Sequence, residues 1–265
     1  HRCTRREKLG VRYPGRASIT VRVQMRASHL RSAPLRWFRG PGGMGFVARI
    51  YNFSPGPAVL PLSVLEKASA GVVELDESGM SVLEISHRGR HFDAIHQEAK
   101  SRLLRLMGLS SSDYAVLFLG GGASLQFHMV PLNFAQGATA AYVDTGHWSE
   151  RAMKEASRVC HVAEAASGRS EKYTRIPGAI DVPEGARYLH ITSNNTIEGT
   201  EWPAPPDGGG VPLVADASSD FLARAEDYSR YSLIYAGAQK NLGPAGVTVV
   251  VARRPFLATA AEGLP

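Results

Sequence analysis

The sequence predicts an α/β fold built on a mainly parallel sheet that is flanked by helices. Short apolar runs, long enough for buried strands, recur along the chain from Tyr114 onward. Segments with helical spacing of apolar residues separate several of these runs, and turns rich in Gly or polar residues connect the others. Strands that are apolar on both faces and alternate with helices are typical of parallel sheets, which bind ligands at the carboxyl ends of their strands.

Two amphipathic helices are expected ahead of the sheet. The first is Leu62–Val73, because its apolar residues recur at helical spacing and Pro61 suits a helix start. The second is His91–Met107, whose apolar stripe stops at Gly108, a residue type that commonly ends helices.

The remaining elements alternate along the chain. The expected strands are Tyr114–Leu119, Ala138–Val143, Arg187–Thr192, Val211–Ala215, Ser232–Tyr235 and Val247–Val251. The expected helices are Ala123–Asn133 and Ser149–Cys160. Residues 167–185 and 204–210 are polar or rich in Pro and Gly, and we expect them to be connectors.

The composition is that of a soluble globular protein, with 44% apolar and 20% charged residues among 265. No run approaches the roughly 18 apolar residues of a membrane span. The two cysteines, Cys3 and Cys160, are too few for a disulfide framework or a Cys-based metal site. We therefore expect a cytoplasmic protein that uses no metal and contacts no membrane.

The excess of basic over acidic residues lies in the N-terminal 43 residues, which hold 11 Lys and Arg and a single acid, Glu7. Residues 44–265 hold 19 basic and 23 acidic residues, a net charge of −4. We expect residues 1–43 to be a disordered extension, with the fold spanning 44–265 and starting near Met44. A transit peptide and a nucleic-acid-binding arm are the alternatives for the extension.

Lys240 occupies a loop of small residues between the apolar runs Tyr231–Tyr235 and Val247–Val251. An amine shielded from water loses its charge more readily and can attack a carbonyl, so the functional hypothesis is Schiff-base chemistry. A solvated turn lysine is the plain alternative.

Four further positions follow expected strands. Gly120–Gly122 opens a helix and can present free backbone amides to a phosphate, although a tight turn would use the same residues. Trp148 could stack on an aromatic cofactor or belong to the core. Thr196 lies in a polar loop as a candidate donor to a phenolic oxygen. Asp216 could hold a protonated pyridine nitrogen or cap a helix.

Several motifs between residues 48 and 265 resemble those of the phosphoserine aminotransferase family, a branch of the class-V aminotransferases. They are Asn52–Ala58, Glu84–Gly89, the Gly-rich segment ending at Gln126–Phe127, Val130–Asn133, Tyr142–Trp148 and Tyr235–Gly246. The resemblance implies the large domain of a fold-type I transferase that uses pyridoxal 5'-phosphate. It also implies a homodimer that moves an amino group between O-phospho-L-serine and 2-oxoglutarate, in serine and in many bacteria pyridoxine biosynthesis.

The resemblance gives each matching position a role. Lys240 would be the Schiff-base lysine and proton carrier, Asp216 would hold the pyridine nitrogen, Trp148 would stack on the ring, and Thr196 would bond the ring oxygen. Ala123, Ser124 and Gln239 would line the cofactor phosphate. Arg88 would hold a substrate carboxylate, since its planar fork of donors suits one. His87 would contact the substrate phosphate, with a structural histidine as the alternative.

Three features depart from the family pattern. Ala123–Ser124 replaces the Gly-Arg of many members, which removes a charge from the phosphate cradle. Ser54–Pro57 replaces Ser-Ser-Gly-Pro, so no substrate contact is carried over to Pro55. The chain is also shorter than the family, and we expect the small C-terminal domain, a substrate-binding arginine and a dimer-crossing segment to be missing.

Three other interpretations remain. The chain could be another class-V enzyme, of the alanine–glyoxylate aminotransferase or cysteine desulfurase type, although a desulfurase needs a late catalytic cysteine and none follows Cys160. It could be a catalytically incomplete fragment. It could instead bind nucleic acid. Only the basic extension could do so, because the acidic balance of residues 44–265 argues against a basic face on the fold.

Overall fold

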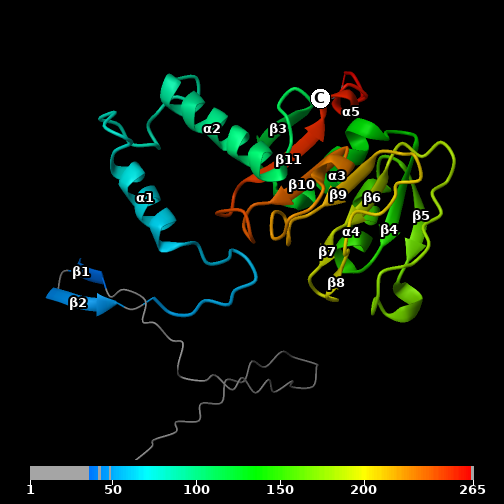
Figure 1. Ribbon diagram of the computed structural model, residues 1–265, viewed down its shortest axis with the longest axis horizontal. Helices are drawn as coiled ribbons and strands as arrows, with labels where there is room; N and C mark the ends of the chain where they lie inside the picture. The colour runs from blue at the N-terminus through cyan, green and yellow to red at the C-terminus, as the bar shows by residue number, and fades with distance from the viewer. Residues whose placement is uncertain (1–35, 41–42, 48, 264–265) are drawn as a thin grey trace, which may run out of the picture. The chain divides into compact units, whose positions relative to one another are not determined.

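The computed structural model describes residues 36–40, 43–47 and 49–263, which form two compact units divided at Tyr51 and Asn52 (Figure 1). The first unit contains an antiparallel hairpin of β1 (Arg36–Gly40) and β2 (Gly43–Val47). The expectation of a disordered extension over residues 1–43 otherwise falls on residues 1–35 and 41–42, outside the described residues. The domain boundary at residue 44 stays a prediction.

The second unit begins with the two expected helices. Helix α1 (Leu62–Val73) has Pro61 at its N-cap and buries none of its residues. Helix α2 (Arg90–Met107) ends at Gly108, whose left-handed backbone (φ 66°) lets its N–H bond back to the last turn. The apolar stripe of α2 is buried only near its C-terminal end, where Leu104 and Met107 join the core.

A seven-stranded sheet forms the rest of this unit, and its strand order is β3-β11-β10-β9-β6-β4-β5. The strands are β3 (Tyr114–Leu119), β4 (Thr139–Asp144), β5 (His161–Ser167), β6 (Leu189–Thr192), β9 (Leu213–Asp216), β10 (Leu233–Gly237) and β11 (Thr248–Arg253). Every neighbouring pair from β10 to β5 is parallel, whereas β11 runs antiparallel to both β3 and β10. The predicted α/β fold with a mainly parallel sheet is therefore confirmed.

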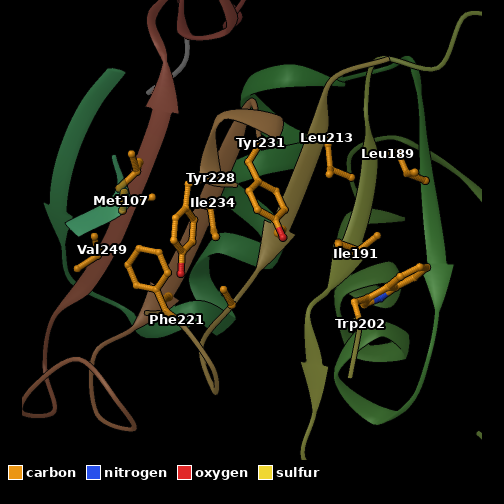
Figure 2. Close-up of a cluster of buried hydrophobic side chains, with 14 of the residues drawn as sticks. Met107, Leu189, Ile191, Trp202, Leu213, Phe221, Tyr228, Tyr231, Ile234 and Val249 are labelled. Atoms are coloured by element: carbon orange, nitrogen blue, oxygen red, sulfur yellow. The ribbon is translucent and has the colours of Figure 1, made fainter. Parts of the chain in front are cut away.

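Both faces of the sheet are buried, because alternate side chains of each strand enter different clusters. Ile234 and Ala236 of β10 belong to one cluster, which also holds the aromatic and aliphatic residues that Figure 2 shows. Leu233 and Tyr235 belong to the other, together with residues of α3 (Gly122–Phe134) and α4 (His147–Ala156). Figure 1 shows α3 and α4 against the sheet.

Three elements differ from the sequence-based expectation. Strand β5 was not predicted, because it lies at the edge of the sheet and exposes His161 and Glu164, so it has no continuous apolar run. Helix α4 begins at His147, which places Trp148 in its first turn instead of in a loop. A small hairpin, β7 (Asn194–Asn195) with β8 (Thr200–Glu201), follows β6. Short elements η2 (Arg169–Glu171), η3 (Tyr228–Arg230) and α5 (Arg254–Leu257) complete the fold.

Within the described ranges, none of the helices combines the length and the apolar character needed to cross a membrane.

Candidate active site

A cavity of about 150 Å³ opens at the carboxyl ends of the strands, on the face that α3 and α4 cover. Its lining comes from the segments that follow β3, β4, β6, β9 and β10. The lining residues are Gly122, Ala123, Ser124, Phe127, Trp148, Thr192, Asn194, Asp216, Ser218, Ser219, Gln239 and Lys240. Parallel strands end at one edge of a sheet, so residues distant in sequence meet there.

Lys240 enters this cavity from the loop between β10 and β11. The loop is fixed at its base, where the Ala238 N–H donates to the Val247 carbonyl at 2.9 Å. The early segment around Gly56 packs against it: the Ala58 N–H donates to the Gln239 carbonyl at 2.8 Å. A Cβ on Gly56 would lie 3.2 Å from Lys240 Cγ, so the backbone there passes directly over the lysine stem. The amine is thereby confined to the cavity side.

Asp216 ends β9 and is almost fully buried, with 4% of its surface exposed. Its Oδ1 accepts hydrogen bonds from the Ser218 backbone N–H at 3.0 Å and the Ser218 hydroxyl at 2.6 Å. Burial raises the pKa of Asp216, while the bonds from Ser218 and the charge of Lys240 act in the opposite direction. The buried carboxyl of Asp216 therefore lines the same cavity as the Lys240 side chain.

Trp148 is held through its backbone by the β7–β8 hairpin. Its N–H donates to Asn195 Oδ1 at 3.0 Å, and the N–H of His147 donates to Glu198 at 3.1 Å. The Lys240 Nζ lies 5.7 Å from the centre of the Trp148 ring. The indole thus forms one wall of the cavity and the lysine another.

The N-terminus of α3 provides a place for an anion. Gly121 and Gly122 both have left-handed backbones, with φ of 87° and 69°, which turn the chain from β3 into the helix. No side chain caps this helix start. The first-turn amides at Ala123 and Ser124 therefore remain available, and an anion bound there would satisfy them.

Three buried polar atoms of the cavity lining have no hydrogen-bond partner within the described part of the chain. They are Trp148 Nε1, Thr192 Oγ1 and Asn194 Oδ1. A buried polar group without a partner costs free energy, so three of them around one cavity indicate a polar ligand. A flat aromatic ligand with an anionic group would fit this lining. Its ring could stack on Trp148, a ring nitrogen could bond the Asp216 carboxylate, and its anionic group could accept from the amides at Ala123 and Ser124.

The structure brings together six of the nine residues predicted for the site: Ala123, Ser124, Trp148, Asp216, Gln239 and Lys240. The other three do not line the cavity. Thr196 is exposed in the turn between β7 and β8, and His87 and Arg88 are exposed in the loop before α2.

Sequence reasoning missed four polar lining residues: Thr192, Asn194, Ser218 and Ser219. All four lie at or just beyond the ends of β6 and β9. Their polar character directly after apolar strands was the signal that could have found them. Which hydroxyl faces the cavity, however, depends on the β7–β8 hairpin, which the sequence alone does not reveal.

The chain is similar in sequence and in structure to known aminotransferases. The family described as aminotransferase class-V matches residues 50–263. Phosphoserine aminotransferases of Niallia circulans and Bacillus subtilis are each 50% identical over 220 residues, which is 82% of this chain and 60% of theirs. The chain thus spans about 60% of the length of these relatives.

Two solved structures agree with this. The phosphoserine aminotransferase from Bacillus circulans subsp. alkalophilus aligns with a TM-score of 0.79 at 50% identity, covering 82% of this chain and 61% of that one. A pyridoxal-phosphate-bound phosphoserine aminotransferase from Trichomonas vaginalis aligns with a TM-score of 0.75 at 37% identity, covering 82% and 62%. The family match over residues 50–263 includes all the strands that carry the cavity.

Proposed function

The chain belongs to the class-V aminotransferase family, and from this premise we propose that it is the cofactor-binding part of a phosphoserine aminotransferase. The cofactor is pyridoxal 5'-phosphate, and the reaction moves an amino group between O-phospho-L-serine and 2-oxoglutarate, with 3-phosphooxypyruvate and L-glutamate as the other pair. The observation that carries the proposal is that Lys240, Asp216 and Trp148 line one cavity.

Pyridoxal phosphate, when bound, supplies an aldehyde that condenses with amines and a pyridine ring that withdraws electrons from the substrate's α-carbon. Lys240 would be the residue that holds the cofactor through this aldehyde, because its side chain lines the cavity from a fixed loop. The same Nζ would serve as the base that takes a proton from the substrate α-carbon and as the acid that returns it. The flexible four-carbon side chain of Lys240 allows the amine both to hold the cofactor and to carry the proton.

Asp216 holds the proton on the pyridine nitrogen. Its buried carboxyl has a raised pKa, so the ionised form attracts a proton more strongly than an exposed aspartate would. The two bonds from Ser218 fix the orientation of Oδ1. The carboxylate would thereby favour the charged, electron-withdrawing form of the pyridine ring.

Trp148, Gln239 and the start of α3 orient the cofactor. The Trp148 indole, which lines the cavity, would hold the ring by stacking and would exclude water from that side of the cavity. The amides at Ala123 and Ser124, with Gln239 beside them, receive the phosphate. The proposal also gives Thr196 the ring oxygen, and Arg88 and His87 the substrate. These three roles are supported by the motif resemblance alone, since none of the three lines the cavity.

The wider setting follows from the same proposal. We infer a homodimer in the cytoplasm that serves serine biosynthesis and pyridoxine biosynthesis. The identity of 50% to curated phosphoserine aminotransferases supports the substrate assignment over other class-V reactions.

Borohydride trapping tests the proposal. Purified chain is mixed with pyridoxal phosphate, reduced with borohydride and digested, and the labelled peptide is identified by mass spectrometry. The label is expected on Lys240 and absent from the Lys240→Ala variant. A label spread over exposed lysines such as Lys67 and Lys154, unchanged by the substitution, would contradict the site.

Amino transfer to 2-oxoglutarate is then compared for phosphoserine, alanine and aspartate as donors. A preference for alanine or aspartate would contradict the substrate assignment.

A further inference from the structure

A buried carboxylate lies at the turn that leads into α4, the helix whose first turn carries Trp148. Asp144 ends β4 and has no exposed surface, yet both of its oxygens are used. Oδ1 accepts from the Ser149 hydroxyl at 3.0 Å. Oδ2 accepts from Arg169 Nη2 at 2.9 Å, the Tyr173 hydroxyl at 3.0 Å and the Ser167 hydroxyl at 3.2 Å. The carboxylate therefore joins the start of α4 to the segment that follows the edge strand β5.

The Ser149 hydroxyl connects the Asp144 carboxylate to the backbone of the turn. Its Oγ accepts the N–H groups of Thr145 at 2.8 Å and Gly146 at 2.9 Å, so the turn from β4 into α4 is folded around one hydroxyl. Trp148 lies between Gly146 and Ser149. Its position at the cavity wall thus depends on where Asp144 holds Ser149.

Arg169 supplies the positive charge for this buried carboxylate. Its side chain is 58% exposed and also contacts Glu150 at 3.1 Å and Glu164 at 4.0 Å. Tyr173 accepts from Arg169 Nε at 3.2 Å and can donate to Asp144 or to Glu150. An exposed ion pair contributes little to global stability, but a fully buried carboxylate that loses its cation is left with neutral donors only.

We propose that Arg169 and Tyr173 are positioning residues for the cofactor, because they hold Asp144, and through Ser149 the turn that places the Trp148 indole in the cavity lining. The inference rests on the proposed function for the ligand, but the geometry of the turn does not depend on it. Complete loss of an aromatic stack lowers affinity about threefold to tenfold, and Arg169→Ala should lose only part of this affinity for pyridoxal phosphate, because the indole is retained.

The test compares Arg169→Ala, Arg169→Lys and Tyr173→Phe with Arg175→Ala. Arg175 is a matched control, since it lies on the same segment, is more exposed and pairs with Glu171 instead of Asp144. Hydrogen exchange of the Thr145 and Gly146 amides is measured in the cofactor-free chain. Energy transfer from tryptophan to bound pyridoxal phosphate is measured in the loaded chain, with Trp148→Phe used to assign the signal.

Arg169→Ala is expected to speed exchange at both amides and to reduce the Trp148 energy transfer, with partial rescue by Arg169→Lys and a smaller effect in Tyr173→Phe. Arg175→Ala should change neither. Unchanged exchange and energy transfer in Arg169→Ala, with the wild type binding the cofactor, would overturn the inference. A wild type that binds no pyridoxal phosphate would overturn the proposed function instead, and the exchange measurement would still decide whether Arg169 orders the turn.

Discussion

The ammonium of Lys240 lies 5.7 Å from the centre of the Trp148 indole, in the same cavity that Asp216 lines. A cation at this distance over a ring is attracted by its π electrons. Trp148 follows β4 and Lys240 follows β10, two strands that β6 and β9 separate in the sheet. Because Trp148 and Lys240 line the same cavity, it has both an aromatic wall and a nucleophile.

Replacing Trp148 by Ala should weaken pyridoxal phosphate binding by roughly threefold to tenfold, because a stacked ring pair contributes about 0.5–1.5 kcal/mol. Trp148→Phe should lose less, since it keeps a ring. Equilibrium titration of cofactor absorbance measures both affinities. Equal losses in the two variants would show that the indole does not stack on the cofactor.

Gly121 and Gly120 form a matched pair at the start of α3. Gly121→Ala places a side chain on a left-handed backbone and brings its Cβ within 2.8 Å of the Leu125 Cβ, so we expect a stability loss of about 1–2 kcal/mol or more. Cofactor binding should weaken with it, since the helix start shifts. Gly120→Ala meets nothing within 4 Å and should leave both unchanged. Urea unfolding and cofactor titration check this, and equal effects in the two variants would count against it.

Asp216→Asn should have opposite effects on stability and on activity. Burial raises the pKa of Asp216 in the folded chain, so its ionisation costs stability as the pH rises through that pKa. The cofactor-free Asn variant should therefore melt at a higher Tm at pH 7, with the gain disappearing when the pH is lowered below about 4, where the unfolded carboxyl is protonated too. Amino transfer should fall by roughly a hundredfold or more.

Asp227→Asn is the control for this prediction. Asp227 also accepts both a backbone and a hydroxyl bond from the serine two positions on, Ser229, but its pKa is lowered by those bonds. Its replacement should lower the Tm slightly at pH 7. A lower Tm in both variants would show that ionised Asp216 does not destabilise the cofactor-free fold.

His190 should make the fold sensitive to acid. Burial lowers the pKa of His190 to about 3, whereas an unfolded histidine has a pKa of about 6.5, so stability is lost as the pH falls below 6.5. Between pH 7 and pH 5 this loss is about 2 kcal/mol. His190→Gln should remove that dependence, at the expense of packing against Tyr142 and the bond to the Tyr235 hydroxyl.

Urea unfolding at pH 7 and pH 5 measures the effect of His190→Gln. The exposed His161→Gln provides the comparison, because its side chain lies on the edge strand in contact with water. If His190→Gln and the wild type lost the same stability between the two pH values, the buried imidazole would not be the source of the acid sensitivity.

The sequence sufficed for Asp216 and Lys240 because each follows an apolar run, and parallel strands bring such positions to one edge. It did not suffice for β5, whose exposed side chains interrupt any apolar run. It did not reveal that Thr192 lines the cavity and Thr196 does not, since this depends on a tight hairpin whose strands are two residues long. Local pattern therefore located the positions that follow strands, and tertiary geometry decided which neighbouring polar residues line the cavity.

The antiparallel pairing of β10 with β11 determines how the lysine can move. Gly237 and Thr248 are paired at the base of the loop, and both Leu242 and Gly243 donate their N–H groups to the Ala238 carbonyl. The loop is tied down on either side, so its backbone acts as a fixed pivot. Any swing of the amine between two reaction partners must then come from rotation about the side-chain bonds of Lys240, and the length of that side chain limits its reach.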